Sequence, residues 1–312
     1  MYYVKDCPDI ETVDRWLMKQ SSMDISHDKY KNQAFVVNLD LDKDKLAASA
    51  IDLYEKYGWF GFVDIFSTEF KRQNVYGGLS LTYDKDYRYA DVIPEIHAQT
   101  LGFPRINIPE NKFEDMSIWK EMIANRTDKR YFYDNHNIVK HTYNDTYAFR
   151  HLTPAVQDGY IGEITKKIKR SLVRSRLASF NPKDAGELSQ RMKDRSWHRD
   201  GSWFTEMRLN INVTALPETF TLQMEDDNGL ELFYEPGKAY VWDTAEPHAY
   251  FANKMVDFQR INLVYAISPW FDYIEEEDAW VPNEFFNKKH PVDMLLNGDV
   301  IDMDFTYEQY RF

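Results

Sequence analysis

The sequence contains one cysteine, Cys7, among 312 residues. One cysteine cannot form an internal disulfide, so a disulfide-stapled secreted scaffold is excluded and a reducing compartment is expected. No run of about 18 apolar residues occurs, and the sequence therefore predicts no membrane-spanning helix. The first residues also lack the basic-then-apolar pattern of a secretory signal. We therefore expect a cytoplasmic protein with no membrane partner.

Basic residues are also fewer than acidic residues. Lys and Arg number 38 against 51 Asp and Glu, which gives a net charge of −13. Such a charge repels a phosphate backbone, so direct binding to nucleic acid is not expected. Hydrophobic residues make up 43% and aromatic residues 16%, as in a globular chain rather than a disordered one. We interpret residues 1–312 as a single domain, and the sequence does not indicate its oligomeric state.

The sequence contains many short β-rich runs. An acidic, glycine-ended cluster at 225–229 separates two of them and predicts a hairpin turn. Closely spaced strands of this kind suit a jelly roll or barrel, whose mouth can hold a ligand. The predicted strands are Arg208–Ala215, Thr219–Met224, Leu230–Tyr234 and Lys238–Trp242.

Three residues in this part of the chain form a candidate metal site. His198 and Asp200 stand two positions apart, which places both side chains on one face of an extended strand. His248 follows after the predicted strands. Two histidines and one carboxylate are the facial triad that binds Fe(II) in oxygenases and leaves coordination positions open. Aromatic residues that flank these ligands are candidates to line the pocket: Trp197, Trp203 and Tyr250.

The order of these pieces resembles that of the Fe(II)/2-oxoglutarate dioxygenases, and within them the aspartyl/asparaginyl β-hydroxylase-like branch. The resemblance covers about residues 170–270. It departs from the branch at Asn210, where a histidine is frequent, and in a longer gap between Pro182 and His198. The matching pieces are Arg176-Leu177-Ala178-Ser179-Phe180-Asn181-Pro182, His198-Arg199-Asp200, Arg208-Leu209-Asn210-Ile211-Asn212-Val213, Gly237-Lys238-Ala239-Tyr240-Val241-Trp242-Asp243, His248 and Arg260-Ile261-Asn262-Leu263-Val264.

The resemblance implies an α+β fold with a double-stranded β-helix (jelly-roll, cupin-like) core over about residues 130–270. Residues 1–90 would then be a helix-and-strand support, and residues 271–312 a tail packed on the core. The implied cofactors are Fe(II) on the triad, 2-oxoglutarate as co-substrate, and O₂.

The same resemblance gives roles to three further residues. Arg260 would bind the distal carboxylate of 2-oxoglutarate, because a guanidinium matches a carboxylate bidentately. Arg208 and Asn210 would contact the other carboxylate. The alternative to this co-substrate role is that Arg260 forms a structural ion pair.

The implied enzyme is a dioxygenase that hydroxylates an unactivated C–H bond and releases succinate and CO₂. Asp200 occupies the position at which halogenating members carry a small residue, so hydroxylation is expected. The expected substrate is an amino acid or an amino-acid-derived small molecule. The alternatives are a peptide or protein side chain, a cupin-like metalloenzyme that does not use 2-oxoglutarate, and a binding protein with a decayed site. The intact triad and Arg260 argue against decay.

A rival metal site must be weighed at three other histidines, His136, His141 and His151. Their spacings bring no carboxylate at a matching offset, so we interpret them as ordinary residues of two predicted strands. The following segment, 154–171, has the apolar periodicity of a helix, with a basic run on its outer side.

Overall fold

The computed structural model describes most of the chain's second half and parts of its first half. The described residues are 4–5, 29–57, 60–63, 72–83, 99–100, 103–104, 147, 149–153, 156–157, 159–180, 197–214, 219–225, 229–252 and 260–312.

The main sheet has eight antiparallel strands in the order β18-β2-β13-β10-β15-β9-β4-β3. Its centre is made by β10 and β15, which pair over six residues from Met207↔Ile267 to Asn212↔Asn262. Every residue of these two strands is buried, so the sheet is covered on both faces. The strands are β2 (Gln33–Leu39), β3 (Phe60–Val63), β4 (Arg72–Ser80), β9 (Arg176–Phe180), β10 (Met207–Asn212), β13 (Lys238–Trp242), β15 (Arg260–Ile267) and β18 (Phe305–Arg311).

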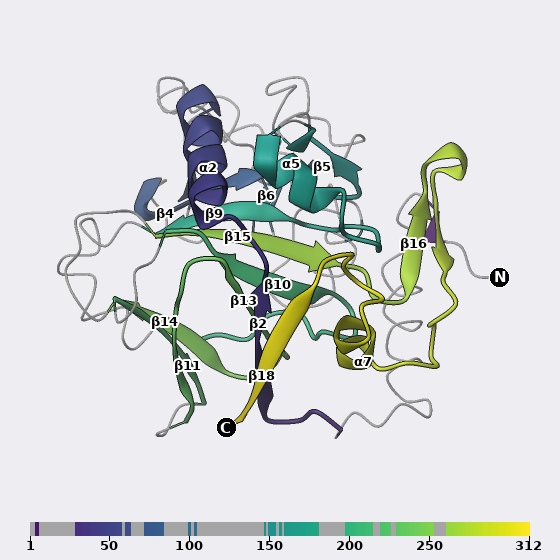
Figure 1. Cartoon of the computed structure of the whole chain (residues 1–312). Helices are drawn as coiled ribbons and strands as arrows, with labels where there is room; N and C mark the ends of the chain where they lie inside the picture. Colours follow the sequence, from purple (N-terminus) through teal and green to yellow (C-terminus); the bar gives the residue numbers. More distant parts are fainter. Residues whose placement is uncertain are drawn as a thin grey trace.

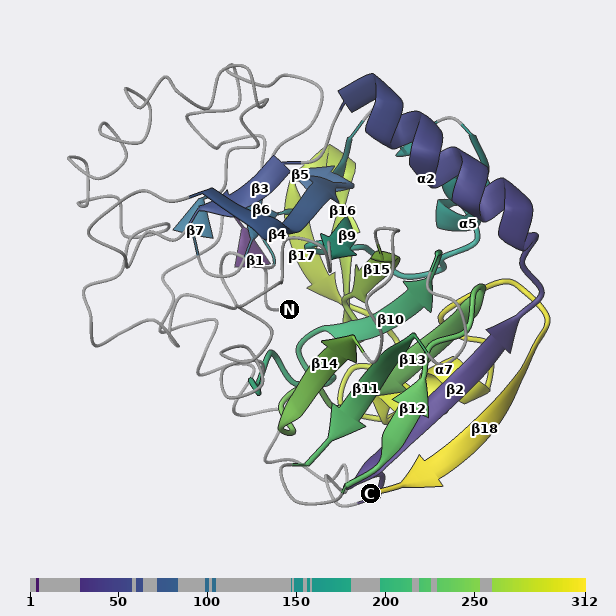
Figure 2. The ribbon, with the colours of Figure 1, turned by 90° about the vertical axis from the view of Figure 1, so that its left-hand side faces the viewer.

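A smaller sheet lies against one face of the main sheet, as Figures 1 and 2 show. It consists of β12 (Glu231–Phe233), β11 (Phe220–Met224) and β14 (His248–Ala252), in that order. An isolated bridge between His198 and His248 adds a short fourth member beside β14. From β9 to β15 the chain crosses repeatedly between the two sheets, and this alternation is the topology of a double-stranded β-helix. The predicted jelly-roll core is therefore confirmed.

The first long strand and the last strand of the described chain form one edge of the main sheet. β2 pairs with β13 on one side and with β18 on the other, so segments from far apart in the sequence lie side by side there (Figure 2). The tail expected to pack on the core thus supplies an edge strand. Seven of its buried apolar residues also lie in the main hydrophobic cluster: Phe271, Trp280, Val292, Met294, Leu295, Val300 and Ile301.

Two helices cover the other face of the main sheet, α2 (Lys43–Tyr57) and α5 (Gly159–Thr165) (Figure 1). Asp42 caps α2, because its Oδ1 accepts a hydrogen bond from the backbone N–H of Lys45 at 3.0 Å. The buried faces of the helices pack on the sheet through Leu46, Ala50, Leu53, Ile161 and Ile164.

The helix predicted over 154–171 is much shorter than its apolar periodicity indicates. α5 ends at Thr165, and Ile168 instead forms a bridge with Ile301 of the C-terminal segment. Tertiary pairing overrides local helix preference here. The basic run consequently follows the helix rather than lying on its outer side. Its last member, Arg170, forms ion pairs with Asp272 and Glu284.

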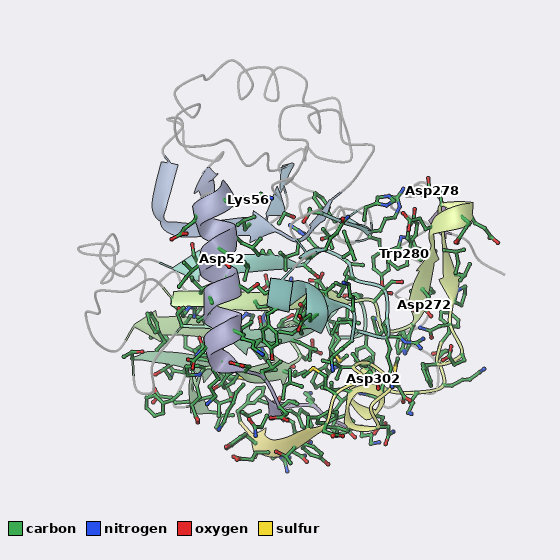
Figure 3. The ribbon with its side chains drawn as sticks, turned by 45° about the horizontal axis from the view of Figure 1, so that its top comes forward. Asp52, Lys56, Asp272, Asp278, Trp280 and Asp302 are labelled. Carbon is green, nitrogen blue, oxygen red and sulfur yellow. The ribbon has the colours of Figure 1, made fainter. Side chains whose placement is uncertain are left out.

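The C-terminal segment also forms a hairpin of β16 (Phe271–Ile274) and β17 (Ala279–Pro282), joined by the 3-10 turn η4 (Glu275–Glu277). Figure 3 labels Asp278 at the tip and Trp280 on β17. The three glutamates of η4 are exposed. Asp278, which follows them, pairs with Arg150 at 2.9 Å.

The remaining elements are short. They are β1 (Val4–Lys5), which pairs with β17, β5 (Thr82–Tyr83), which pairs with β8 (His151–Leu152), the pair β6 (Gln99–Thr100) and β7 (Phe103–Pro104), and the helix α7 (Pro291–Leu296). His136, His141 and the strands predicted around them lie outside the described residues. Within the described part of the chain, no helix is long and apolar enough to cross a membrane.

Candidate metal centre

Backbone pairing between two segments of the smaller sheet brings His198 and His248 together. Each residue donates its N–H to the other's carbonyl oxygen, at 3.0 and 3.1 Å. The imidazole centroids lie 4.2 Å apart. Asp200 is fixed beside them, since its N–H donates to the Thr244 carbonyl at 2.7 Å. The spacing of two between His198 and Asp200 thus places both side chains toward His248, as the sequence predicts.

The ligand atoms of these three residues converge on one point. Oδ2 of Asp200 lies 3.7 Å from Nε2 of His198 and 3.9 Å from Nε2 of His248, and all three ligand atoms lie within 4.8 Å of one another. Two atoms that each bind one ion at about 2.1 Å can be no more than about 4.2 Å apart, so each histidine lies within the range in which it could share an ion with Asp200. The donor set, two imidazoles and one carboxylate, suits Fe(II) and leaves positions open.

His248 is held in the form that a metal requires. Its Nδ1 lies 2.9 Å from the carbonyl oxygen of Glu246, and donation to that carbonyl leaves the lone pair on Nε2, which faces Asp200. Burial, followed by the charge of His198, lowers the pKa of His248 to about 4. The imidazole is therefore neutral at pH 7. His198 lies at the rim, with 41% of its side chain exposed, so the centre can be reached from solvent.

The carboxylate of Asp200 is ionised at neutral pH. Burial disfavours the charge, but the Arg208 guanidinium and then the two imidazoles outweigh it and hold the pKa of Asp200 far below its usual range. Arg208 contacts Asp200 and Glu206 through separate nitrogens, and all three side chains are largely buried. Asp200 is thus oriented by a guanidinium that is itself held by a second carboxylate.

A turn after β13 aligns the two ligand-bearing segments. Asp243 accepts hydrogen bonds from the N–H groups of Trp203 and Ala245, at 3.2 and 3.1 Å, and from the Ser202 hydroxyl at 3.2 Å. It therefore ties the segment that follows Asp200 to the turn that precedes His248. Burial raises the pKa of this carboxyl group.

Arg260, the first residue of β15, points between the two sheets and is 5% exposed. Its Cζ lies 5.6 Å from the ring centroid of Phe220, 5.4 Å from that of Tyr234 and 4.8 Å from that of Tyr250. The ring of Tyr250 also lies 6.0 Å from that of His248. The ring of Tyr250 therefore lies close both to the triad and to the Arg260 guanidinium, which three aromatic rings surround.

The other two residues with a predicted co-substrate role, Arg208 and Asn210, lie in the same interior between the two sheets. Arg208 lies with Asp200 and Glu206, as described above. Asn210 is buried, and its amide donates to the Tyr240 carbonyl oxygen at 3.3 Å. The expected roles of Arg208 and Asn210 toward 2-oxoglutarate stay predictions.

Of the flanking aromatics, Tyr250 lies within the site, whereas Trp203 does not. Trp203 packs against His290, with ring centroids 5.4 Å apart, in the cluster on the helix-covered side. Trp197 lies against Phe251, 6.1 Å between centroids. His151, from the rival set, contacts Tyr273, and no metal-binding group that includes it is found among the described residues.

Sequence reasoning missed the roles of two residues in this interior, Glu206 and Arg176. Glu206 is 2% exposed and precedes Arg208 by two positions, so both face the same way. That i, i+2 pairing of opposite charges at the start of a predicted strand is a signal that could have identified Glu206. Arg176 stood within the matched strand, without an assigned role.

The comparisons with known proteins find structures of low similarity and no match in sequence. No protein-family model matches the sequence, and none of the curated proteins matches it. A 2OG-Fe(II) oxygenase family oxidoreductase from Burkholderia pseudomallei is 10% identical over 71% of this chain and 77% of that one, with a TM-score of 0.30. A Pseudomonas putida prolyl-4-hydroxylase is 11% identical over 84% and 100%, with a TM-score of 0.31. Both TM-scores are low, so the functional conclusion rests on this chain's own residues.

Proposed function

We propose that this protein is an Fe(II)- and 2-oxoglutarate-dependent hydroxylase that acts on an amino acid or an amino-acid-derived small molecule. The observation that carries the proposal is the convergence of His198, Asp200 and His248 one aromatic ring away from Arg260. A metalloenzyme that did not use 2-oxoglutarate would have no need of a buried guanidinium at that place.

Each residue has a defined task in this reaction. The triad holds the iron, which, with 2-oxoglutarate as reductant, supplies dioxygen activation and yields the hydroxylated product, succinate and CO₂. Arg260 binds the distal carboxylate of 2-oxoglutarate, and the rings around it exclude water from that ion pair. Arg208 and Glu206 keep the Asp200 carboxylate ionised and oriented.

Substrate-stimulated turnover tests the proposal. Anaerobic protein with Fe(II) and 2-oxoglutarate is exposed to air with each proteinogenic amino acid in turn, and succinate is measured. We expect one or a few amino acids to increase succinate release, and His248→Ala to abolish it. If wild-type protein neither binds 2-oxoglutarate calorimetrically in the presence of Mn(II) nor forms succinate, the oxygenase proposal is wrong.

A peptide or protein side chain is the second candidate substrate. The observation that favours it is the exposed edge of His198, which a side chain on a large partner can approach. Stimulation by peptides, with none by any free amino acid, would select this candidate while leaving the oxygenase proposal in place.

A further inference from the structure

Arg176 occupies the beginning of β9 and faces the interior that contains the triad. Its neighbour Leu177 belongs to the cluster under α2 and α5, so the alternation of the strand turns Arg176 toward the smaller sheet. The charges that act on its guanidinium include those of Asp200, Glu206 and Arg208. Arg176 therefore belongs to the surroundings of the metal centre.

The guanidinium of Arg176 has no counter-ion within the described part of the chain. Its Nε is buried without a hydrogen-bond acceptor, and among the described residues its side chain forms no ion pair or hydrogen bond. Burial, then repulsion by Arg208 and Arg174, lowers the pKa of Arg176 to about 10, which leaves it charged at pH 7. The side chain as a whole is partly buried. A partly desolvated charge without an ion-pair partner is costly, so such a residue is unusual unless something binds it.

The nearby carboxylates are already engaged. Arg208 contacts both Asp200 and Glu206, so both of these carboxylates already have a guanidinium partner. Neither of them forms an ion pair with Arg176 in the described part of the chain.

The register separates Arg176 from the co-substrate's arginine. Arg176 lies opposite Val264, whereas Arg260 lies opposite Phe180. Four residues along β15 amount to about 13 Å, so the two guanidiniums serve different ends of the interior.

We propose that Arg176 binds a carboxylate of the substrate. A guanidinium matches a carboxylate with two parallel hydrogen bonds, and here it would gain its missing counter-ion. The substrate class is then a small free carboxylic acid, such as an amino acid with an unblocked carboxylate. This inference rests on the proposed function, because it assigns the group that orients the substrate in the same site.

Acetate and acetamide form a matched pair of probes for this subsite. Protein labelled with ¹⁵N-arginine is loaded with diamagnetic Zn(II) and 2-oxoglutarate, and the Nε–H resonance of Arg176 is identified by its absence in Arg176→Lys. We expect acetate to shift this resonance saturably in the millimolar range, since few-atom ligands bind weakly. Acetamide, which has the same shape without the charge, should leave it unchanged.

Control variants separate this subsite from general effects. In Arg170→Gln, which removes an arginine from an ion pair outside the jelly-roll interior, the acetate response should persist. In Arg176→Gln, acetate binding measured by calorimetry should fall by more than tenfold, while the 2-oxoglutarate affinity stays within twofold of wild type. Arg176→Lys should retain part of the acetate binding.

Two results would overturn the assignment of Arg176. One is an unmoved resonance at saturating acetate with 2-oxoglutarate bound. The other is competition between acetate and 2-oxoglutarate, which would make Arg176 a co-substrate residue. Failure of wild-type protein to bind 2-oxoglutarate at the loading step would instead contradict the proposed function, so the two failures are distinguishable.

Discussion

The two faces of the main sheet differ in composition although the same strands supply both. The face under α2 and α5 is apolar, whereas the face toward the smaller sheet is polar around β9, β10 and β15. Apolar residues on the first face include Leu177, Leu209, Ile211, Leu263 and Tyr265, and polar residues on the second include Arg176, Arg208, Asn210, Arg260 and Asn262.

The difference shows how one strand can serve stability and chemistry at once. Side chains alternate along a strand, so each of these strands contributes to a core and to a site. Both faces are buried, and buried polar groups are costly unless they bind partners. The polar face is therefore the place where ligands are expected, and the apolar face the place where folding free energy is gained.

The largest effect is expected at Arg260, on the polar face. Arg260→Ala should weaken 2-oxoglutarate binding by about 3–5 kcal/mol, because a buried carboxylate would lose its counter-ion. Calorimetry with Mn(II)-loaded protein measures this. Arg260→Lys should recover part of the loss, and an unchanged affinity in Arg260→Ala would transfer the role to Arg208.

The second-largest effect is expected on the apolar face. Leu263 and Asn262 are adjacent residues of β15 that lie on opposite faces, so their replacement compares the two faces directly. Leu263→Ala should lower the free energy of unfolding by about 3 kcal/mol, since it opens a cavity beneath the helices. Asn262→Ala, one residue earlier on the polar face, should cost less than about 1 kcal/mol, because its buried Oδ1 has no hydrogen-bond donor among the described residues. Urea denaturation compares them, and equal losses would contradict the division between the faces.

Loss of a metal ligand should leave the fold intact. His248→Ala should weaken Mn(II) or Fe(II) binding by more than the roughly 10–100-fold typical of changes outside the ligand set. Metal analysis after desalting, alongside a melting temperature, measures both properties. Retention of full metal stoichiometry would show that other residues hold the ion.

The smallest effect lies at the rim of the apolar side, where Asp293 of α7 accepts hydrogen bonds from Lys29 and Tyr30, at 2.7 and 2.6 Å. Burial alone would raise the pKa of Asp293, but the bonds from Lys29 and Tyr30 outweigh it and lower that pKa. A lowered pKa stabilises the fold above the unfolded carboxyl's pKa, and the contribution disappears as pH falls through the folded value.

Asp293→Asn should therefore destabilise the protein at pH 7 by less than about 1 kcal/mol, because Lys29 is half exposed and solvent screens the pair. The difference from wild type should begin to shrink near about pH 4, where the unfolded carboxyl takes up its proton, and should vanish once the pH falls below the folded pKa. Urea titrations at several pH values test the sign. A difference that grew on acidification would contradict the pairing.

Local patterns predicted much of the core strands and the three ligands. The run Lys238–Trp242 coincides with β13, and Thr219–Met224 coincides with β11 to within one residue. The α2 helix has the local features that are typical of a helix, a capping Asp42 and an apolar stripe. Periodicity failed over 154–171, because the partner that ends that helix early, Ile301, lies far away in the chain.

The sequence by itself determined which side chains share a face, because alternation and the HxD spacing are local properties of an extended chain. It thereby pointed to His198 and Asp200, with His248, as candidate metal ligands. Only the tertiary structure decided that Arg208 pairs with Asp200 and Glu206, that aromatic rings enclose Arg260, and that Arg176 lacks a described counter-ion. These contacts join strands whose pairing is non-local, so their partners follow from sheet register and burial.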